Sequence, residues 1–159
     1  MKAKWYGDAM KEKIARSQAS DADVLTAIAI AAKKHWGYSD EQIEKWREEM
    51  TVSEEDIKED IVFHLEKEGK IVGFYSLSKE DESFEIEHLW ILPEYIGQGL
   101  GKILFEHARE TAVKNGARHI RAESDPNAEG FYLKMGMKRT GEKESSIPGR
   151  MLPVLEITL

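Results

Sequence analysis

The sequence predicts an α/β fold, because strand patterns alternate with helical ones along the chain. Segments 22–35 and 100–115 repeat apolar residues at the spacing of amphipathic helices. Between them, segments 61–66, 71–78 and 84–92 are rich in β-branched and aromatic residues and are separated by turn residues. This pattern favours a three-stranded meander. A sheet that shares its core with helices is the simplest architecture for this order of elements.

Composition is typical of one globular domain. The chain has 159 residues, with 41% hydrophobic and 33% charged residues and a net charge of −7. The acidic balance argues against a nucleic-acid partner and favours cationic ligands. No apolar run reaches the length of a membrane span, and residues 1–13 are too polar for a secretory signal. Cysteine is absent, so we expect no thiolate metal site and a location in the reducing cytoplasm.

Two helix start signals of the same kind lie in the N-terminal half. Ser39 is followed three residues later by Gln42, and Ser53 by Asp56. In a capping box, each side chain of such a pair binds the backbone N–H of the other residue. We therefore expect a helix from Ser39 and a further short turn from Ser53, after a first helix that Gly37 ends.

Short elements complete the C-terminal half. Segment 117–123 is predicted to be a strand, 128–134 a short helix, and 137–143 and 152–159 two closing strands. Together with the meander and a short strand at 14–18, these elements give seven strands.

A turn with three glycines connects the meander to the helix that starts at Leu100. Gly97, Gly99 and Gly101 stand at alternate positions. Glycine has no Cβ, so its backbone can approach a ligand closely. The first N–H groups of a helix lack partners within the helix, and the macrodipole makes that end positive. The turn is therefore predicted to bind an anion, most often a phosphate.

Two familiar phosphate motifs do not fit this turn. A dinucleotide fingerprint requires G-x-G-x-x-G near the start of a βαβ unit, whereas this chain has G-x-G-x-G in mid-chain. A P-loop requires glycine where Ile96 stands and serine or threonine where Ile103 stands. The remaining interpretations are a cradle for another phosphate ligand, or a turn that only connects a strand to a helix.

At these residues the chain resembles the GNAT superfamily of acyl-CoA-dependent N-acyltransferases. The family pattern P-x-Y-R-G-x-G-x-G is similar to residues 93–101, except that Ile96 replaces the usual arginine or glutamine. Residues 125–137 are similar to a second family block, often written A-x-x-F-Y-x-K-x-G-F. Residues 16–23 resemble the first strand of the family and its entry to the first helix, and residues 1–12 lie outside the resemblance.

The resemblance implies one GNAT domain over residues 1–159, with a mixed, mostly antiparallel sheet of six to seven strands and helices on both faces. It implies transfer of an acetyl group from acetyl-CoA to an amine by direct attack in a ternary complex, without a metal. Coenzyme A would be held largely by backbone groups. The implied cofactor-binding residues are Ile91, Leu92, Gly97, Gln98, Gly99, Leu100, Gly101, Lys102, Asn127 and Tyr132.

The expected catalytic residues are Tyr132 and Glu87. Tyr132 occupies the tyrosine position of the second block, where its phenol could protonate the leaving thiolate; the alternative is a packed aromatic residue beside Phe131. Glu87 is the preferred general base, because burial on a covered strand would raise its pKa. Glu85 and His88 are alternative bases. Strand alternation predicts one face shared by Glu85, Glu87, Leu89 and Ile91, and another shared by Ile86, His88 and Trp90.

The acceptor amine is expected beside the aromatic cluster His35, Trp36 and Tyr38, because the corresponding region usually lines the acceptor pocket in the family. Aromatic walls suit an amine with an apolar body and can hold a cation by the ring face. Glu85 and His88 complete the expected acceptor-binding residues.

Together these features favour a small-molecule amine as acceptor. A non-catalytic acyl-CoA sensor and an acetyltransferase for protein N-termini or lysines are the alternatives. Arg150 would pair either with an acidic group of the substrate or with a surface carboxylate. The resemblance also allows a homodimer.

Overall fold

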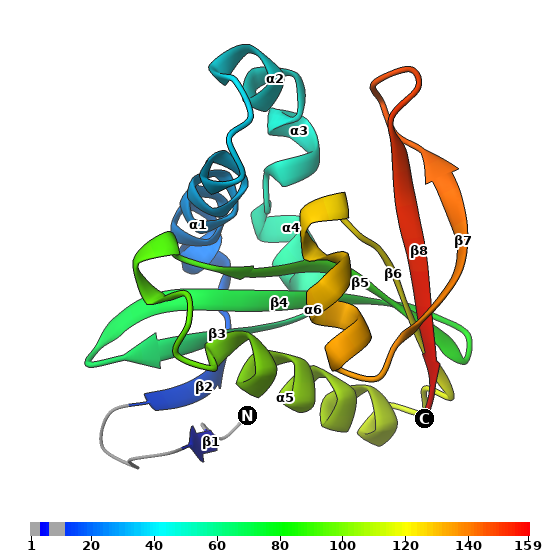
Figure 1. Cartoon of the computed structure of the whole chain (residues 1–159). Coiled ribbons are helices and arrows are strands. Elements are labelled where there is room, and N and C mark those ends of the chain that lie inside the picture. The colour runs from blue at the N-terminus through cyan, green and yellow to red at the C-terminus, as the bar shows by residue number, and fades with distance from the viewer. Residues whose placement is uncertain (1–3, 7–11) are drawn as a thin grey trace.

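The computed structural model describes residues 4–6 and 12–159, with one mixed sheet at its centre (Figure 1). The strand order is β1-β2-β3-β4-β5-β6-β8-β7, and β5 and β6 form the parallel pair among antiparallel neighbours. The strands are β1 (Lys4–Tyr6), β2 (Glu12–Arg16), β3 (Ile61–Lys67), β4 (Lys70–Glu80), β5 (Ser83–Ile91), β6 (His119–Glu123), β7 (Lys138–Glu144) and β8 (Met151–Thr158).

Helices cover both faces of the sheet, as Figure 1 shows. One face carries the first four helices, and the other carries α5 and α6. The helices are α1 (Ala22–His35), α2 (Asp40–Lys45), α3 (Arg47–Met50), α4 (Glu54–Glu59), α5 (Leu100–Lys114) and α6 (Glu129–Lys134). The predicted α/β class, the mixed, mostly antiparallel sheet and the helices on both faces are confirmed. Strand β1 adds an eighth strand from the residues outside the resemblance.

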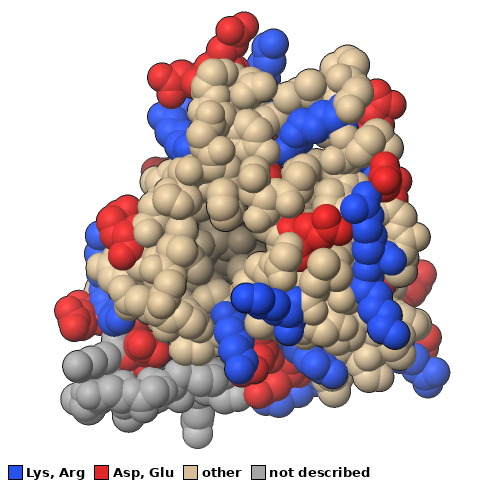
Figure 2. Space-filling model, viewed as in Figure 1, with Lys and Arg blue, Asp and Glu red and all other residues tan. Residues whose placement is uncertain are grey.

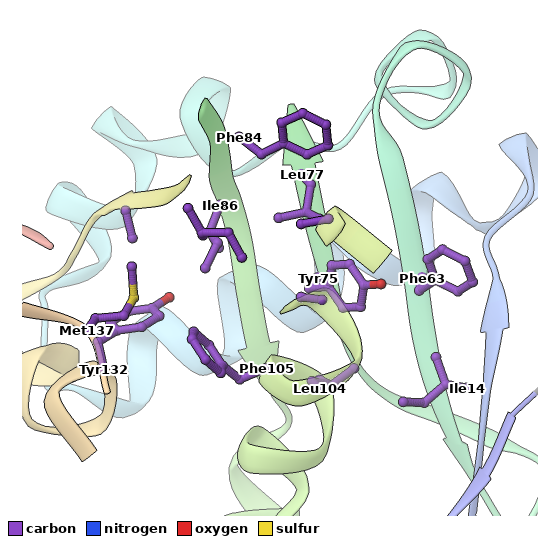
Figure 3. Packing of buried hydrophobic residues seen from close by; sticks show 14 of the residues in the cluster. Ile14, Phe63, Tyr75, Leu77, Phe84, Ile86, Leu104, Phe105, Tyr132 and Met137 are labelled. Carbon is purple, nitrogen blue, oxygen red and sulfur yellow. The ribbon is translucent and has the colours of Figure 1, made fainter. Parts of the chain in front are cut away.

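The apolar core has one part on each face of the sheet. On the α5 face, Phe63 and Tyr75 of the sheet are fully buried in the same cluster as Leu104 and Phe105 of α5. Figure 3 shows this cluster, which extends to Tyr132 of α6. On the other face, buried residues of α1 to α4 pack against Val62 and Phe74. The sheet thus buries apolar side chains on both of its faces.

Both predicted capping boxes are present. The Ser39 hydroxyl accepts the Gln42 N–H at 3.2 Å and begins α2, and the Ser53 hydroxyl accepts the Asp56 N–H at 3.0 Å and begins α4. The turn expected from Ser53 is thus a short helix. After α1, Gly37 takes a positive φ of 89°, which is the conformation that favours glycine at a helix end.

Strand β5 contains a bulge at Glu87. Ser76 is opposite His88 and Leu77 is opposite Ile86, so Glu87 is one extra residue on β5. An extra residue reverses the alternation of side chains beyond it. Ile86 and Leu89 therefore both belong to the core on the α5 face, whereas the ring of His88 lies 5.6 Å from that of Phe74 on the other face.

The bulge makes the predicted faces of this strand wrong. Glu85 does not share a face with Leu89 and Ile91, and His88 does not share one with Ile86. The prediction assumed an uninterrupted period of two residues, and a bulge breaks that period.

Strands β5 and β6 separate beyond the bulge. Their parallel ladder runs from Ser83 and His119 to Ile86 and Ala122, whereas β5 continues beside β4 as far as Ile91. In the described part of the chain, the edge of β5 from Glu87 to Ile91 therefore has no strand partner on the β6 side. No described helix is long and apolar enough to cross a membrane.

We predict that Gly73→Ala destabilises the fold. A Cβ at Gly73 would stand 2.5 Å from Ile91 Cδ1 and 2.8 Å from the Trp90 carbonyl oxygen, which is backbone and cannot rotate away. Overpacking of this kind costs about 1–3 kcal/mol. Urea unfolding measures the loss.

The control is Gly141→Ala in β7, where an added Cβ meets nothing within 4 Å. It should change the free energy of unfolding by less than about 0.5 kcal/mol. Equal stability of the two variants would contradict the close approach of β5 to Gly73.

Candidate active site

The glycine turn presents open backbone at the start of α5. Gly97 and Gly99 have positive φ values of 89° and 78°, a region that L side chains rarely adopt. Gly99 is the residue that caps α5. A Cβ at either glycine would meet nothing within 4 Å, so the space beside the turn is free. Unpaired N–H groups at a helix start, next to open space, suit an anion.

Gly101 brings α6 against the same helix start. A Cβ at this position would lie 3.1 Å from the Phe131 ring. Its absence lets α5 and α6 approach closely, which places Phe131 and Tyr132 beside the turn. The two blocks of sequence that carried the resemblance are therefore in contact.

A cavity of about 500 Å3, here called the glycine cavity, lies between this turn, the end of β5, the end of α1 and α6. In the view of Figure 2, a hollow near the middle of the molecule is walled mostly by uncharged residues. The cavity brings together most of the predicted cofactor residues: Ile91, Gly97, Gly99, Leu100, Gly101, Lys102, Asn127 and Tyr132.

Leu92 and Gln98 do not line the glycine cavity. The Leu92 N–H donates to the Val72 carbonyl at 2.8 Å, and the Leu92 carbonyl accepts the Tyr95 N–H at 2.9 Å. Both backbone groups of Leu92 thus already have a partner within the chain, and its contact with the cofactor stays a prediction. The side chain of Gln98 accepts a hydrogen bond from the Lys67 ammonium, and its backbone role stays a prediction.

Tyr132 is buried but reaches the glycine cavity. It is 7% exposed and packs against the rings of Phe131 and Phe105, with centroids 5.3 and 6.4 Å away. Among the described residues, its hydroxyl has no hydrogen-bond partner. Burial raises the pKa of the phenol, so it keeps its proton at neutral pH. Tyr132 can therefore donate a proton to an atom that enters the cavity.

A second cavity, of about 490 Å3 and here called the charged cavity, opens on the face of α1 to α4. Its walls include Trp46 and Trp90, and Trp90 lines both cavities, so the two adjoin at this residue. The carboxylates in its wall are Glu49, Glu85, Glu87, Glu123, Asp125 and Glu144, and the cations are Lys33, Lys143 and Arg150.

The two candidate carboxylates of β5 differ in their partners. Arg121 Nη1 donates to both oxygens of Glu85, at 2.7 and 2.9 Å, and to Glu123 at 2.9 Å. Burial raises the pKa of Glu85, and the Arg121 charge opposes that rise. Glu87 is exposed, accepts the Ser78 hydroxyl at 2.7 Å and has no ion pair within the described residues. The burial predicted for Glu87 is therefore wrong, because at the bulge its side chain lies exposed in the wall of the charged cavity.

His88 is a neutral, half-buried imidazole. Trp90 Nε1 donates to its Nδ1 at 3.0 Å, which places the ring proton on Nε2. Burial lowers the pKa of His88 to about 4. His88 lines the charged cavity but is a weak base with one lone pair already engaged.

The three aromatic residues predicted to bind the acceptor do not line one cavity together. His35 lines neither cavity, and Trp36 lines the glycine cavity instead. The Tyr38 hydroxyl donates to Asp125 at 3.0 Å, behind the wall of the charged cavity. None of the three residues lines the charged cavity, and their contact with an acceptor stays a prediction. Trp46 and Trp90 provide the aromatic surface of that cavity.

The segment between β7 and β8 closes one side of the charged cavity. Trp46 Nε1 donates to the Ser146 hydroxyl at 3.1 Å, and Arg150 Nη2 donates to the Tyr38 hydroxyl at 2.6 Å. Ile147 packs against the core of α1 to α4. These contacts join residues far apart in sequence, and they enclose the cavity on this side.

Several residues of the charged cavity were missed by sequence reasoning. Trp46 is 3% exposed, and a buried tryptophan on the apolar face of a helix gives no signal of a site. Lys33 lies in the last turn of α1, where a lysine is common and gives no signal. Asp125 opened the second block of resemblance, and that signal could have found it. No group of three metal-ligating side chains occurs in the described part of the chain.

A family model and curated proteins match parts of this chain. The model of the acetyltransferase (GNAT) domain matches residues 35–147. A peptidyl-lysine N-acetyltransferase, YjaB, of Salmonella typhimurium is 40% identical over 86 residues, which are 54% of this chain and 55% of that protein. The chain thus spans about half the length of the curated relatives it matches.

Two solved structures show the same fold. The PaiA N-acetyltransferase of Thermoplasma acidophilum, in complex with coenzyme A, has a TM-score of 0.79 at 24% identity, covering 94% of this chain and all of that one. The ribosomal-protein-S18-alanine N-acetyltransferase of Escherichia coli has a TM-score of 0.69 at 17% identity, covering 92% of this chain and 93% of that one.

The fold and the two adjoining cavities define an α/β protein with an open glycine turn beside a split sheet. Since the domain model covers most of the chain, this protein belongs to the GNAT acetyltransferase family.

We predict that His88 makes the protein less stable in acid. Its pKa of about 4 lies below the unfolded value of 6.5, so only the unfolded chain gains a proton as the pH falls through that interval. Between pH 7.5 and pH 4.5 this should cost about 2–3 kcal/mol of unfolding free energy. Urea unfolding at both pH values measures the loss.

The matched variant is His88→Asn, whose amide oxygen can accept the Trp90 N–H without titrating. Between pH 7.5 and pH 4.5, the unfolding free energy of this variant should fall by about 2–3 kcal/mol less than that of the unchanged protein. An equal loss in both proteins would show that His88 titrates normally.

Proposed function

We propose that this chain transfers an acetyl group from acetyl-CoA to the amine of a small molecule, by direct attack in a ternary complex. The observation that carries the proposal is the meeting of the two cavities at Trp90, where β5 and β6 separate. A thioester lying along the free edge of β5 would have its sulfur on the side of Tyr132 and its carbonyl toward the charged cavity. A cytoplasmic location, suggested by the absence of cysteine, is part of this proposal.

Coenzyme A fits the glycine cavity by its chemistry. The pyrophosphate would accept backbone N–H groups between Gly97 and Lys102, and the Lys102 ammonium would add a cation. Ile96 is 50% exposed and offers no polar atom, so backbone groups carry the contact. The amides of the pantetheine would pair with the outward peptide groups of residues 87–91, as a strand would. The fold of a coenzyme A complex, matched at a TM-score of 0.79, supports this placement.

Glu87 is the proposed general base. It lies at the bulge, lines the charged cavity and has no cation holding its oxygens among the described residues. It would accept a proton from the attacking amine, directly or through water. Glu85 is less suited because Arg121 occupies both of its oxygens, and His88 because its pKa is about 4.

Bond changes in the proposed reaction balance without a covalent enzyme intermediate. The amine nitrogen attacks the thioester carbon, a C–N bond forms, and the C–S bond breaks after a tetrahedral oxyanion that a backbone N–H at the bulge can stabilise. The amine proton goes to Glu87. The Tyr132 hydroxyl donates its proton to the leaving sulfur.

A small acceptor is favoured over a protein chain. The contacts of Trp46 with Ser146 and of Arg150 with Tyr38 enclose the charged cavity on one side, where a peptide acceptor would need an open groove. The name of a relative, a peptidyl-lysine N-acetyltransferase, makes a lysine side chain the second candidate. A sensor without catalysis would bind acetyl-CoA and release no thiol.

We predict release of free coenzyme A thiol when the protein is given acetyl-CoA and a panel of amines, and a much lower kcat for Tyr132→Phe. Loss of a general acid typically costs about 10²–10⁴-fold in rate. The hydroxyl has no structural partner among the described residues, so its removal should leave the fold intact. Thiol detection measures the rate.

Coenzyme A should raise the melting temperature of both proteins equally, because a ligand at 100 times its Kd adds about 2.7 kcal/mol. An unchanged kcat in Tyr132→Phe would remove that residue from the mechanism. No thermal shift in either protein would contradict the proposed function itself.

A further inference from the structure

The charged cavity carries an excess of positive charge at the end formed by α1 and the segment between β7 and β8. Lys33 and Arg150 both form ion pairs with Asp125, the one carboxylate that pairs with them in residues 12–159. The side chains of Lys33 and Arg150 are 12% and 19% exposed, and that of Asp125 is 4% exposed. Two cations thus share one anion, mostly out of water.

Asp125 has little capacity left to neutralise them. One of its oxygens accepts the backbone N–H and the side-chain amide of Asn127, at 2.8 and 2.9 Å. The other accepts Lys33, Arg150 at 3.2 Å and the Tyr38 hydroxyl at 3.0 Å. Burial, and then the neighbouring Arg150 charge, lower the pKa of Lys33 in spite of Asp125. Glu49 lines the same cavity and its charge opposes the lowering of the Lys33 pKa, but Glu49 is exposed and forms an ion pair with neither cation in the described residues.

The aromatic rings at this end are already occupied by the protein's own cations. Lys33 Nζ lies 4.7 Å from the ring centroid of Trp46 and 5.1 Å from that of Tyr38. Arg150 Cζ lies 5.0 and 5.3 Å from the same two centroids. Cation–π attraction that could have bound a substrate cation is therefore satisfied internally. A second cation would meet repulsion here, contrary to what the aromatic cluster suggested from sequence.

Arg150 retains unused hydrogen-bond donors. Its Nη2 donates to Tyr38 and Asp125, whereas Nε and Nη1 have no acceptor among the described residues. A mostly buried donor is costly when unsatisfied. The planar fork of a guanidinium matches the two oxygens of a carboxylate.

We propose that the acceptor amine carries a carboxylate, which binds Arg150 and Lys33 while the amine faces Glu87. This inference rests on the proposed function and names the substrate class of the same site. The charges in the wall of the charged cavity match such an acceptor. Cations for its carboxylate come from α1 and from the segment before β8, and carboxylates for its amine come from β5. A plain alkylamine or a polyamine leaves the cationic end of the cavity unpaired.

The test compares pairs of amines that differ only by a carboxylate: 4-aminobutyrate with propylamine, lysine with 1,5-diaminopentane, and phenylalanine with 2-phenylethylamine. Measured by thiol release, the most active carboxylated probe should have a kcat/KM roughly 10- to 100-fold higher than that of its partner amine. An acceptor without a carboxylate leaves mostly buried donors of Arg150 unpaired. Arg150→Gln should abolish that preference through a higher KM for the carboxylated probe. Arg150→Lys, which keeps the charge and loses the fork, should retain part of it.

The control is Arg139→Gln, the same arginine-to-glutamine substitution made in β7. Arg139 pairs with Glu129 and Glu142 and lines neither cavity, so the preference should be unchanged. Coenzyme A should still raise the melting temperature of every variant, which shows that each is folded.

Three outcomes overturn the inference. Equal or better turnover of the partners without a carboxylate would do so, and so would a preference that survives in Arg150→Gln. Turnover of none of the carboxylated probes, while coenzyme A still binds, would also do so and would leave the coenzyme A site standing. Loss of coenzyme A binding as well would instead count against the proposed function.

Discussion

Strand β5 has one residue more than the stretch of β4 that it faces, and it is paired on only one side beyond that residue. The extra residue, Glu87, shifts the register between Ser76 and Leu77, and the ladder with β6 ends at Ile86. Peptide groups in a sheet interior must pair, so an unpaired strand edge inside a fold either meets water or a ligand. Both cavities of this protein lie along that edge.

The bulge also decides the chemistry on each side. It keeps Leu89 and Ile91 in the apolar core beneath the glycine cavity, and it directs Glu87 to the charged cavity. The buried phenol of Tyr132 lines the glycine cavity, whereas most of the charged side chains of the two cavities line the charged cavity. Such a division suits a reaction in which a thiolate leaves on one side and an amine arrives from the other. Gly73 allows β5 to approach β4 closely at the end of this edge.

Much of this could be predicted from the sequence, and the failures have physical reasons. Local signals gave α1 its bounds, and the two serine caps and the glycine turn were also predicted, because each depends on neighbouring residues alone. The faces of β5 could not be predicted, since a bulge depends on the register of a second strand. The network of Lys33, Asp125 and Arg150 joins residues up to 117 positions apart in the chain. A network formed by such distant residues leaves no periodic pattern in the sequence.

A crystal structure of the complex with coenzyme A tests the central claim most directly. We expect the pyrophosphate on the N–H groups of residues 97–102, with the thiol sulfur between the edge of β5 and the Tyr132 hydroxyl. The oxygen–sulfur distance should be within hydrogen-bonding range, about 3–4 Å. A coenzyme A molecule bound elsewhere, or a sulfur directed away from the gap between β5 and β6, would contradict it.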